Sequence, residues 1–514
     1  MKIPLRSLVM WLGAPLLIGV AGLLLGQDAN WDFRNYHYYN GYAFLTGRLG
    51  FDILPANHPS YYNPLLDAGV FWLMQHLPSW LVSLLLGTFQ GLIAPLLYRL
   101  ALTVAPPAPG RHLLAAILAA AGCTGALAVS EIGATFHDNT LTVPVLAGLL
   151  LVLQALARDA RGRTLWLAVG GAALLIGAAC GLKLTMSLYA VGLAVALVLA
   201  LPLRRLAPAL VVAGGAGLAG MLLTGGYWSW VLWSRFQNPM FPHFNNVFHS
   251  VFAGDTAYRD MKFIEKLGPL ERIFLPFFST FDSWRVAESD FLDARLLAAF
   301  VVCLPALLFL RRAGPPQRAL IGFAAAAYVV WVWLYCIYRY VLPLEMLAPV
   351  LVLAGLLVLR LPHAPRLAGA IAVALALATS YPKTLEPERI GFADRFVVVQ
   401  DIPTLPPDTL VAMAGDHPTA FMIPSFPATI RFVRINDWPF LGQSDDKGFA
   451  PLIRRTIAEH KGPIMVLTDP EEIERARGIA KLFGLRLTED CNTLLTNLTV
   501  ERFLLCPAQR IDTM

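Results

Sequence analysis

The residues best suited to chemistry lie in a polar stretch that follows the first apolar segment. Asp28 and Asp32 stand four residues apart, so both carboxylates share one face if the stretch is helical. A carboxylate beside low-dielectric surroundings can have its pKa raised toward neutral pH, which suits a general base. Aspartate is also a common helix cap. Spacing alone favours the capping role for this pair.

A second polar turn, from Ser130 to Asn139, holds Glu131, His137 and Asp138 between two apolar segments. Ionisable groups at membrane depth are costly and are commonly functional. Asp138 could instead cap the helix that follows. We interpret the turn as functional.

Two cations stand near apolar segments in a similar way. Lys183 is the lone charge of a long apolar run, where a lysine can snorkel to the interface or clamp a phosphate. Its isolation favours the clamp. Arg339, between Tyr338 and Tyr340, could bind phosphate or anchor its helix. A fourth patch begins with tryptophans typical of an interfacial belt and continues through Asn238.

These residues must be positioned by membrane helices, because the composition is that of a membrane protein. The chain has 514 residues, of which 57% are hydrophobic and 14% charged. Soluble domains carry about a quarter charged residues. The net charge of +6 is explained by basic cytoplasmic loops, so we expect no nucleic-acid partner.

About eleven apolar stretches are long enough, or nearly so, to span a bilayer as helices. They are 8–26, 80–102, 112–130, 141–156, 165–182, 186–201, 206–232, 292–310, 318–336, 342–359 and 366–381. The first follows Lys2 and Arg6 and resembles a signal peptide, but we read it as a retained helix. Alternate short loops are basic, which predicts a cytoplasmic N-terminus and places the long loops 27–79 and 234–291 and the C-terminus outside.

The outward segments have structure of their own. Asn35–Arg48 and Pro64–Leu77 are predicted to be helices at the membrane interface. The segment 382–514 is predicted to be a small soluble α/β domain, with strands at 409–414, 463–468, 494–496 and 502–506 and a helix at 471–483. The predicted fold is thus mainly α, a polytopic membrane domain (1–381) followed by this domain. Cys491 and Cys506 form a plausible disulfide if the domain is periplasmic. The other four cysteines lie singly in apolar runs and form no metal pattern.

The order of these elements resembles the GT-C superfamily of membrane glycosyltransferases, which use polyprenyl-phosphate-linked sugars. The acidic loop runs through Leu45-Thr46-Gly47-Arg48 to Tyr61-Tyr62-Asn63-Pro64. An Asp-Asn turn, Gly181-Leu182-Lys183-Leu184-Thr185, an Asn-Pro-x-Phe-Pro loop and Tyr338-Arg339-Tyr340 follow. The resemblance covers 1–381, and the ordered set is more specific than any one motif.

The resemblance implies a role for each candidate residue. A loop carboxylate deprotonates the acceptor hydroxyl, which displaces the lipid phosphate from the sugar. Asp32 fits best, because Asp32-x-x-x-Tyr36 is similar to the opening of relatives; Asp28 is second, and Asp138 assists by orienting the acceptor or His37. Lys183 and Arg339 neutralise the departing phosphate. The implied substrate-binding residues are Tyr36, His37, Tyr61, Asn63, His137, Asn238, Tyr338 and Tyr340.

The implied partners are a polyprenyl-phosphate sugar, a glycan, lipid or protein acceptor, and membrane lipids of a bacterial inner membrane. The tandem Asp-Glu pair of some branches is absent, so no metal and no cofactor is expected. Three alternatives stay open. A polysaccharide polymerase or ligase would use loop arginines and histidines without an acidic first loop. A secondary transporter would show internal repeats and charges at the bilayer midplane. A non-enzymatic scaffold would lack the acidic loop's carboxylates.

Overall fold

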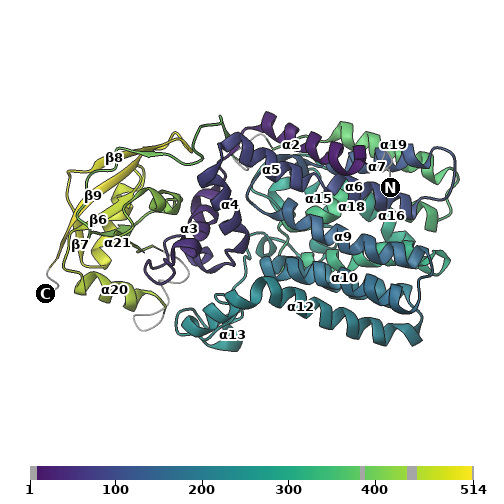
Figure 1. The fold of residues 1–514 in the computed structure, drawn as a ribbon, viewed down its shortest axis with the longest axis horizontal. Helices are drawn as coiled ribbons and strands as arrows, with labels where there is room; N and C mark the ends of the chain where they lie inside the picture. Colours follow the sequence, from purple (N-terminus) through teal and green to yellow (C-terminus); the bar gives the residue numbers. More distant parts are fainter. Residues whose placement is uncertain (1–7, 383–387, 437–447, 512–514) are drawn as a thin grey trace. The chain divides into compact units, whose positions relative to one another are not determined.

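The chain folds into two compact units, each assembled from three separate parts of the sequence (Figure 1). The computed structural model describes residues 8–382, 388–436 and 448–511. We call the first unit the membrane unit; it comprises Met1–Gly26, Ser83–Gly226 and Asp260–Pro387. We call the second the sheet unit; it comprises Gln27–Val82, Tyr227–Arg259 and Glu388–Met514. The first long loop and the C-terminal segment therefore belong to the same compact unit.

The membrane unit is built from apolar helices. Among the described residues, six spans are long and apolar enough to cross a membrane: Ser79–Val104 (α5, Ser79–Gln90, and α6, Ile93–Val104), Asp138–Ala157 (α9), Gly162–Leu182 (α10), Leu203–Phe236 (α12), Pro315–Leu334 (α17) and Tyr338–Val358 (η8, Tyr338–Val341, and α18, Leu342–Val358). Five are shorter: Val9–Leu25 (η1, Val9–Gly13, and α2, Ala14–Leu25), Arg111–Cys123 (α7), Leu184–Ala200 (η4, Leu184–Met186, and α11, Ser187–Ala200), Arg295–Leu308 (α16) and Ala364–Ala378 (α19). Each matches one predicted stretch, and the polytopic membrane fold is confirmed.

Short elements connect these helices. In the membrane unit they are α8 (Ala126–Ser130), η5 (Ile264–Lys266), α14 (Pro269–Ile273), α15 (Leu275–Ser279), η6 (Ser283–Arg285) and η7 (Leu310–Arg312). In the sheet unit, α13 (Asn245–Phe248) follows α12, and η9 (Ala420–Ser425) lies between the strands β4 and β5 of the C-terminal segment.

Helix α18 is the innermost helix of the membrane unit. Of its span, 94% is buried, whereas only 11% of the α12 span is buried. A helix that is apolar all round and enclosed by neighbours is a core helix. Within η8, which begins this span, Tyr338 and Val341 are buried, whereas Arg339 and Tyr340 are half-buried.

Helices α10 and α12 approach closely through small residues. A Cβ added at Gly177 would lie 2.0 Å from the carbonyl oxygen of Gly217, and one at Gly220 would lie 2.2 Å from that of Leu174. The Thr224 hydroxyl also donates a hydrogen bond of 2.8 Å to the Ala178 carbonyl. Small residues that allow two backbones to touch are typical of helix pairs in membranes. The glycines of this region thus fix the position of α10, which ends just before Lys183.

The sheet unit contains a mixed sheet (Figure 1). β4 (Leu410–Met413) lies between β5 (Arg431–Arg434) and β6 (Ile464–Thr468) and is parallel to both. β6 is antiparallel to β9 (Phe503–Arg510), which also pairs with β7 (Leu485–Leu487) and β8 (Asn492–Thr496). β3 (Val399–Gln400) pairs with β8. The helices are α20 (Ala450–Glu459) and α21 (Ile473–Leu482). The predicted α/β character and the four predicted strands are confirmed, whereas β5, β7 and α20 were not predicted.

The first long loop packs onto the C-terminal segment within the sheet unit. Its helices are η2 (Phe33–His37), α3 (Tyr38–Thr46), η3 (His58–Tyr61) and α4 (Leu65–His76). A two-stranded sheet pairs β1 (Gln27–Asp28) with β2 (Arg389–Ile390). Arg48 forms a buried ion pair with Asp52 at 2.7 Å and donates a second hydrogen bond, of 2.6 Å, to the Ile430 carbonyl. The structure has a helix at each of the two predicted positions, and Phe44 of α3 packs against the hydrophobic core of this unit.

The predicted cysteine pair is also present. Cys491 and Cys506 are joined by a disulfide bond. The bond links β9 to the residue before β8, its neighbouring strand in the sheet.

Candidate functional site

The turn between α8 and α9 is held in place from several helices of the membrane unit. Asp293 accepts a hydrogen bond of 2.8 Å from the Ala126 amide, and Glu345 accepts one of 3.1 Å from the Ala128 amide. The Gln90 side chain accepts one from the Gly133 amide at 2.7 Å. His137 has a φ of 66°, a left-handed conformation that turns the chain into α9. These contacts fix a polar loop among apolar helices.

Lys183 and Asp138 meet at this turn, although 45 residues separate them in the chain. The Lys183 Nζ atom donates to Asp138 Oδ1 at 2.7 Å and to the Phe136 carbonyl at 3.2 Å. α10 ends at Leu182, and Lys183 is extended, which directs its side chain out of the helix. The Asp138 side chain is fully buried, whereas Lys183 keeps 23% of its side chain exposed. Asp138 therefore holds an accessible ammonium group in a defined position.

Arg339 joins the same group of side chains. Its guanidinium lies 4.3 Å from the centre of the Phe136 ring. The neighbouring Tyr340 ring lies 5.5 Å from Lys183 Nζ, and the Tyr340 carbonyl accepts a 2.7 Å hydrogen bond from Tyr189. Two cations that the sequence places far apart thus gather around residues 136–138. Such a pair is suited to binding a phosphate group.

Glu131 is a member of this site that our list of candidate residues omitted. Its side chain is 2% exposed, and neither carboxyl oxygen has a hydrogen-bond partner. Burial, and then the neighbouring Asp138 carboxylate, raise the pKa of Glu131 well above its usual range. The sequence signal was its place, with two other titratable residues, in a turn between apolar helices.

Glu131 and Arg339 both line a cavity of about 70 Å³ in the membrane unit. Its other polar lining residues are Ser130, Asp260, Glu288, Ser289 and Tyr340. Its apolar side is formed by Leu127, Phe136, Phe263, Val286, Ala287 and Ile337. The cavity therefore has room for a small polar group between a carboxyl and a guanidinium.

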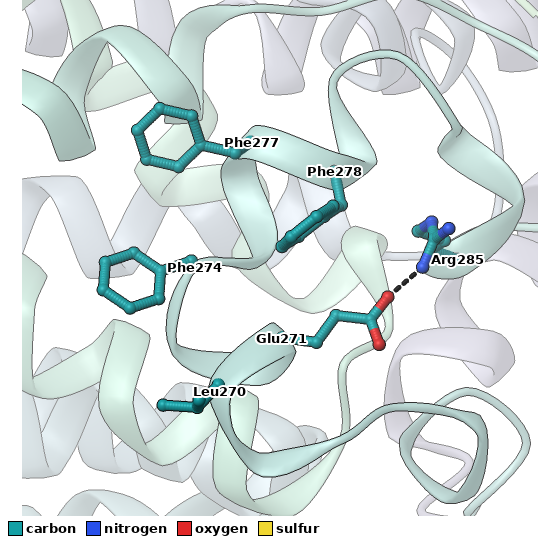
Figure 2. A pocket seen from close by; sticks show the side chains of 6 residues that line it. All are labelled: Leu270, Glu271, Phe274, Phe277, Phe278 and Arg285. Atoms are coloured by element: carbon teal, nitrogen blue, oxygen red, sulfur yellow. Dashed lines mark hydrogen bonds and ion pairs between the residues drawn. The ribbon is translucent and has the colours of Figure 1, made fainter.

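A second, more open cavity of about 660 Å³ lies in the same unit, along α14 and α15 (Figure 2). Figure 2 shows the rings of Phe274, Phe277 and Phe278 along it, with Glu271 paired to Arg285 at one side. Its volume is in the range of ligand pockets, which are mostly apolar with a few polar groups. An apolar chain with a polar end matches this lining.

The first-loop candidates lie in the sheet unit. Asp32 is partly exposed and accepts a 3.1 Å hydrogen bond from the Tyr36 hydroxyl. Asp28 is fully buried and accepts hydrogen bonds from the amide and the side chain of Asn30, at 3.1 and 2.7 Å. Asp28 therefore has a turn-forming contact, whereas Asp32 retains access to solvent.

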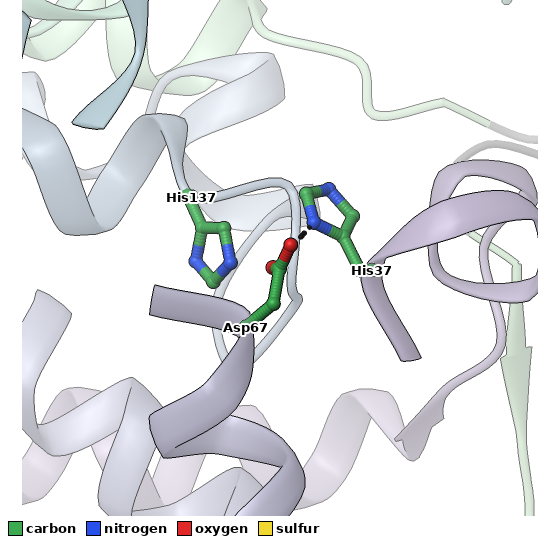
Figure 3. Close-up of side chains that lie close together, drawn as sticks. All are labelled: His37, Asp67 and His137. Carbon is green, nitrogen blue, oxygen red and sulfur yellow. Dashed lines mark hydrogen bonds and ion pairs between the residues drawn. The ribbon is translucent and has the colours of Figure 1, made fainter. Parts of the chain in front are cut away.

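His37 has a carboxylate partner in the same unit. Its Nδ1 atom lies 2.7 Å from Asp67 Oδ1, a contact that Figure 3 marks. A histidine oriented by a carboxylate has a fixed tautomer. Asp67 was not among the sequence candidates, because it lies within an apolar helix, α4.

A histidine and tyrosine cluster also lies in the sheet unit. The Tyr258 hydroxyl and His58 Nε2 are 2.6 Å apart, and His243 Nδ1 lies 3.1 Å from the Tyr258 carbonyl. Burial, with His243 beside it, lowers the pKa of His58 to about 3. Asn238 supports this loop, because its side chain donates to the His243 carbonyl at 2.9 Å.

The remaining candidates are separated from these groups or are buried. Tyr61 belongs to the aromatic core of the sheet unit and stacks on Phe449 at 5.6 Å. The Asn63 side chain accepts a hydrogen bond from the Leu65 amide at the start of α4. Tyr338 is 2% exposed and packs edge-on against Phe291.

Comparison with known proteins gives a likeness of fold. No family model matches the sequence, and no curated protein matches it. Two solved structures match in fold. ArnT from Cupriavidus metallidurans bound to undecaprenyl phosphate has a TM-score of 0.53 at 12% identity, and the apo state of ArnT has 0.52 at 13%. Each match covers 98% of both chains. The chain thus shares the fold of these ArnT structures over nearly its whole length.

Proposed function

We propose that the chain is a membrane glycosyltransferase that moves a sugar from a polyprenyl-phosphate donor to an acceptor hydroxyl. The observation that carries this proposal is the convergence of Lys183 and Arg339 at the turn 130–138. A polyprenyl phosphate presents one anionic head to such a cation pair. The fold match supports it, because ArnT was solved with undecaprenyl phosphate bound.

In this proposal the phosphate is held and neutralised by the membrane unit. Lys183 supplies a point charge whose position Asp138 sets, and Arg339 supplies several N–H donors. Charge develops on the phosphate as the bond to the sugar breaks, so fixed cations stabilise the transition state more than the ground state. The apolar cavity along α14 and α15 is suited to part of the lipid chain.

The base of the proposed reaction is Asp32. Its partial exposure favours it over the fully buried Asp28, and the Tyr36 hydroxyl donates a hydrogen bond that orients its carboxylate. Asp32 takes the acceptor's hydroxyl proton, and the acceptor oxygen then attacks the anomeric carbon. The acceptor remains a glycan, lipid or protein hydroxyl.

The disulfide supports the proposed orientation. Disulfides persist in oxidising compartments such as the bacterial periplasm. Cys491–Cys506 therefore agrees with a sheet unit on the periplasmic face of an inner membrane, with the basic loops on the cytoplasmic face.

The experiment is a binding titration of undecaprenyl phosphate with the full chain in nanodiscs. Lys183→Ala and Arg339→Ala should each weaken binding roughly 10-fold or more, because each removes a charge-assisted contact. The matched controls are Lys461→Ala and Arg455→Ala, which remove exposed cations of the sheet unit and should leave binding unchanged. Failure of the wild-type chain to bind undecaprenyl phosphate would overturn the proposal.

A further inference from the structure

Glu131 is a buried charge-bearing group that the roles proposed above leave unused. It lies in the membrane unit, directly after the last residue of α8, and its side chain is 2% exposed. Neither oxygen has a hydrogen-bond partner. Burying an ionised carboxylate without partners costs a large free energy. The Glu131 carboxyl group is therefore neutral, or it receives a partner from a ligand.

The neighbouring carboxylate has the opposite environment. Asp138 Oδ1 accepts a hydrogen bond from the Lys183 ammonium at 2.7 Å. The two carboxyl groups interact electrostatically, so one charge disfavours the other. When one of two neighbouring carboxyl groups has a fixed cationic partner and the other has none, the first is suited to hold a charge and the second to donate a proton. Glu131 is the neutral member of this pair.

Its surroundings point to the phosphate as the group that would receive its proton. Glu131 and Arg339 line the same cavity, and the Lys183 ammonium also interacts electrostatically with Glu131. A phosphate bound by these two cations would therefore be brought next to Glu131. The charged and titratable groups that face Glu131 are Asp138 from α9, Lys183 from the end of α10, Arg339 from η8, Glu345 from α18, and the cavity-lining Asp260 and Glu288.

We propose that Glu131 is the general acid of the reaction, donating its proton to the phosphate of the departing polyprenyl phosphate. This inference rests on the proposed function. The acceptor oxygen bonds to the anomeric carbon as the bond from that carbon to the phosphate oxygen breaks. The electron pair of the broken bond stays with the phosphate, Asp32 takes the hydroxyl proton, and the Glu131 proton goes to a phosphate oxygen. Phosphate monoesters have a second pKa of about 6, so the product can accept this proton near neutral pH.

The reaction leaves Glu131 as a carboxylate beside two cations. Arg339 and Lys183 then stabilise its charge until a solvent proton restores the acid, while Asp32 returns its proton to solvent. No oxidant or reductant is required. Because one charge is removed from the product phosphate, its attraction to Lys183 and Arg339 falls, which favours release of the lipid.

The test compares the wild-type chain with Glu131→Gln. This isosteric change keeps a hydrogen-bond donor but removes the acidic carboxyl proton. The control Glu265→Gln removes an exposed carboxylate from the same unit. The first readout needs no sugar: infrared spectra at neutral pH, with and without added undecaprenyl phosphate. We expect a neutral-carboxyl carbonyl band that is absent from Glu131→Gln, and that shifts or is lost when undecaprenyl phosphate binds.

The second readout is the pH profile of transfer from undecaprenyl-phosphate-linked sugars in native membranes. We expect Glu131→Gln to lower kcat roughly 100-fold. Wild-type kcat/KM should fall as pH rises through the pKa of Glu131, and the variant should lack this alkaline limb. An unchanged infrared band or an unchanged pH profile in Glu131→Gln would overturn the inference while leaving the proposed function in place. Absence of undecaprenyl phosphate binding in the wild type would overturn both.

Discussion

At the scale of single residues, the acidic side chains differ in their contacts. Asp28 accepts two hydrogen bonds from Asn30 within a turn, Asp138 holds Lys183, and Asp32 keeps access to solvent. Sequence spacing favoured capping for both first-loop aspartates, but the side chain that accepts the Phe33 amide is that of Asn30, which in turn donates to Asp28. Asp28 and Asp32 can therefore be compared directly by substitution.

Asp32→Asn should lower kcat about 10²–10⁴-fold, because an amide cannot accept the acceptor's proton. Binding of undecaprenyl phosphate should remain at the wild-type level, since the proposed phosphate-binding residues belong to the membrane unit. The measurement is release of undecaprenyl phosphate from a lipid-linked sugar in native membranes. Asp28→Asn, the paired variant, should lower the unfolding temperature instead. Wild-type turnover by Asp32→Asn would exclude Asp32 as the base.

A second residue-scale prediction concerns acid stability. The folded state lowers the pKa of His58 to about 3, from about 6.5 in the unfolded chain, so folding favours the neutral form. Stability from this group is present above pH 6.5 and is lost as pH falls from there toward 3. Thermal unfolding followed between pH 7 and 4 should show a smaller decline for His58→Gln than for wild type. His249→Gln, at a side chain that is 66% exposed, should follow the wild-type curve.

At the scale of elements, the site depends on where α10 ends. Gly177 lets α10 touch α12, and Lys183 lies less than two turns further on. Gly177→Ala places a methyl group 2.0 Å from the Gly217 carbonyl oxygen. Overpacking of this kind costs about 1–3 kcal/mol. We expect a lower unfolding temperature in detergent and weaker undecaprenyl phosphate binding.

The matched control for Gly177 is another glycine of the same helix pair. A Cβ added at Gly214 would meet nothing within 4 Å, so Gly214→Ala should leave the unfolding temperature unchanged or slightly raised. Equal effects of the two substitutions would show that close packing of α10 on α12 does not set the position of Lys183.

The same scale shows what sequence reasoning can and cannot find. Membrane helices and the strands β4, β6, β8 and β9 were predictable, because their signals are local runs of apolar residues. β5 was missed, since arginines at both its ends, Arg431 and Arg434, hide a short apolar strand. Arg434 is 1% exposed and donates its hydrogen bonds to backbone carbonyls such as those of Pro55 and Gly415. Burial of an arginine by such contacts leaves no sequence signal.

At the scale of the whole molecule, the limits of sequence reasoning come from long-range contacts. Lys183, Arg339 and Asp138 were each predicted as site residues, but their meeting at one turn depends on how α9, α10 and η8 pack. Glu131 becomes prominent only when its burial and its lack of partners are known. The interleaving of two units along the chain likewise leaves no trace in hydropathy, because the long loops read as insertions.

The central claim is that the cations at the turn 130–138 bind the head of a polyprenyl phosphate. The most direct test is native mass spectrometry of the full chain with its co-extracted lipids, comparing wild type with the double variant Lys183→Ala/Arg339→Ala. The account predicts that wild type retains a polyprenyl phosphate or its sugar-linked form, and that the double variant carries ordinary phospholipids alone. Retention of polyprenyl phosphate by both proteins, or by neither, would contradict it.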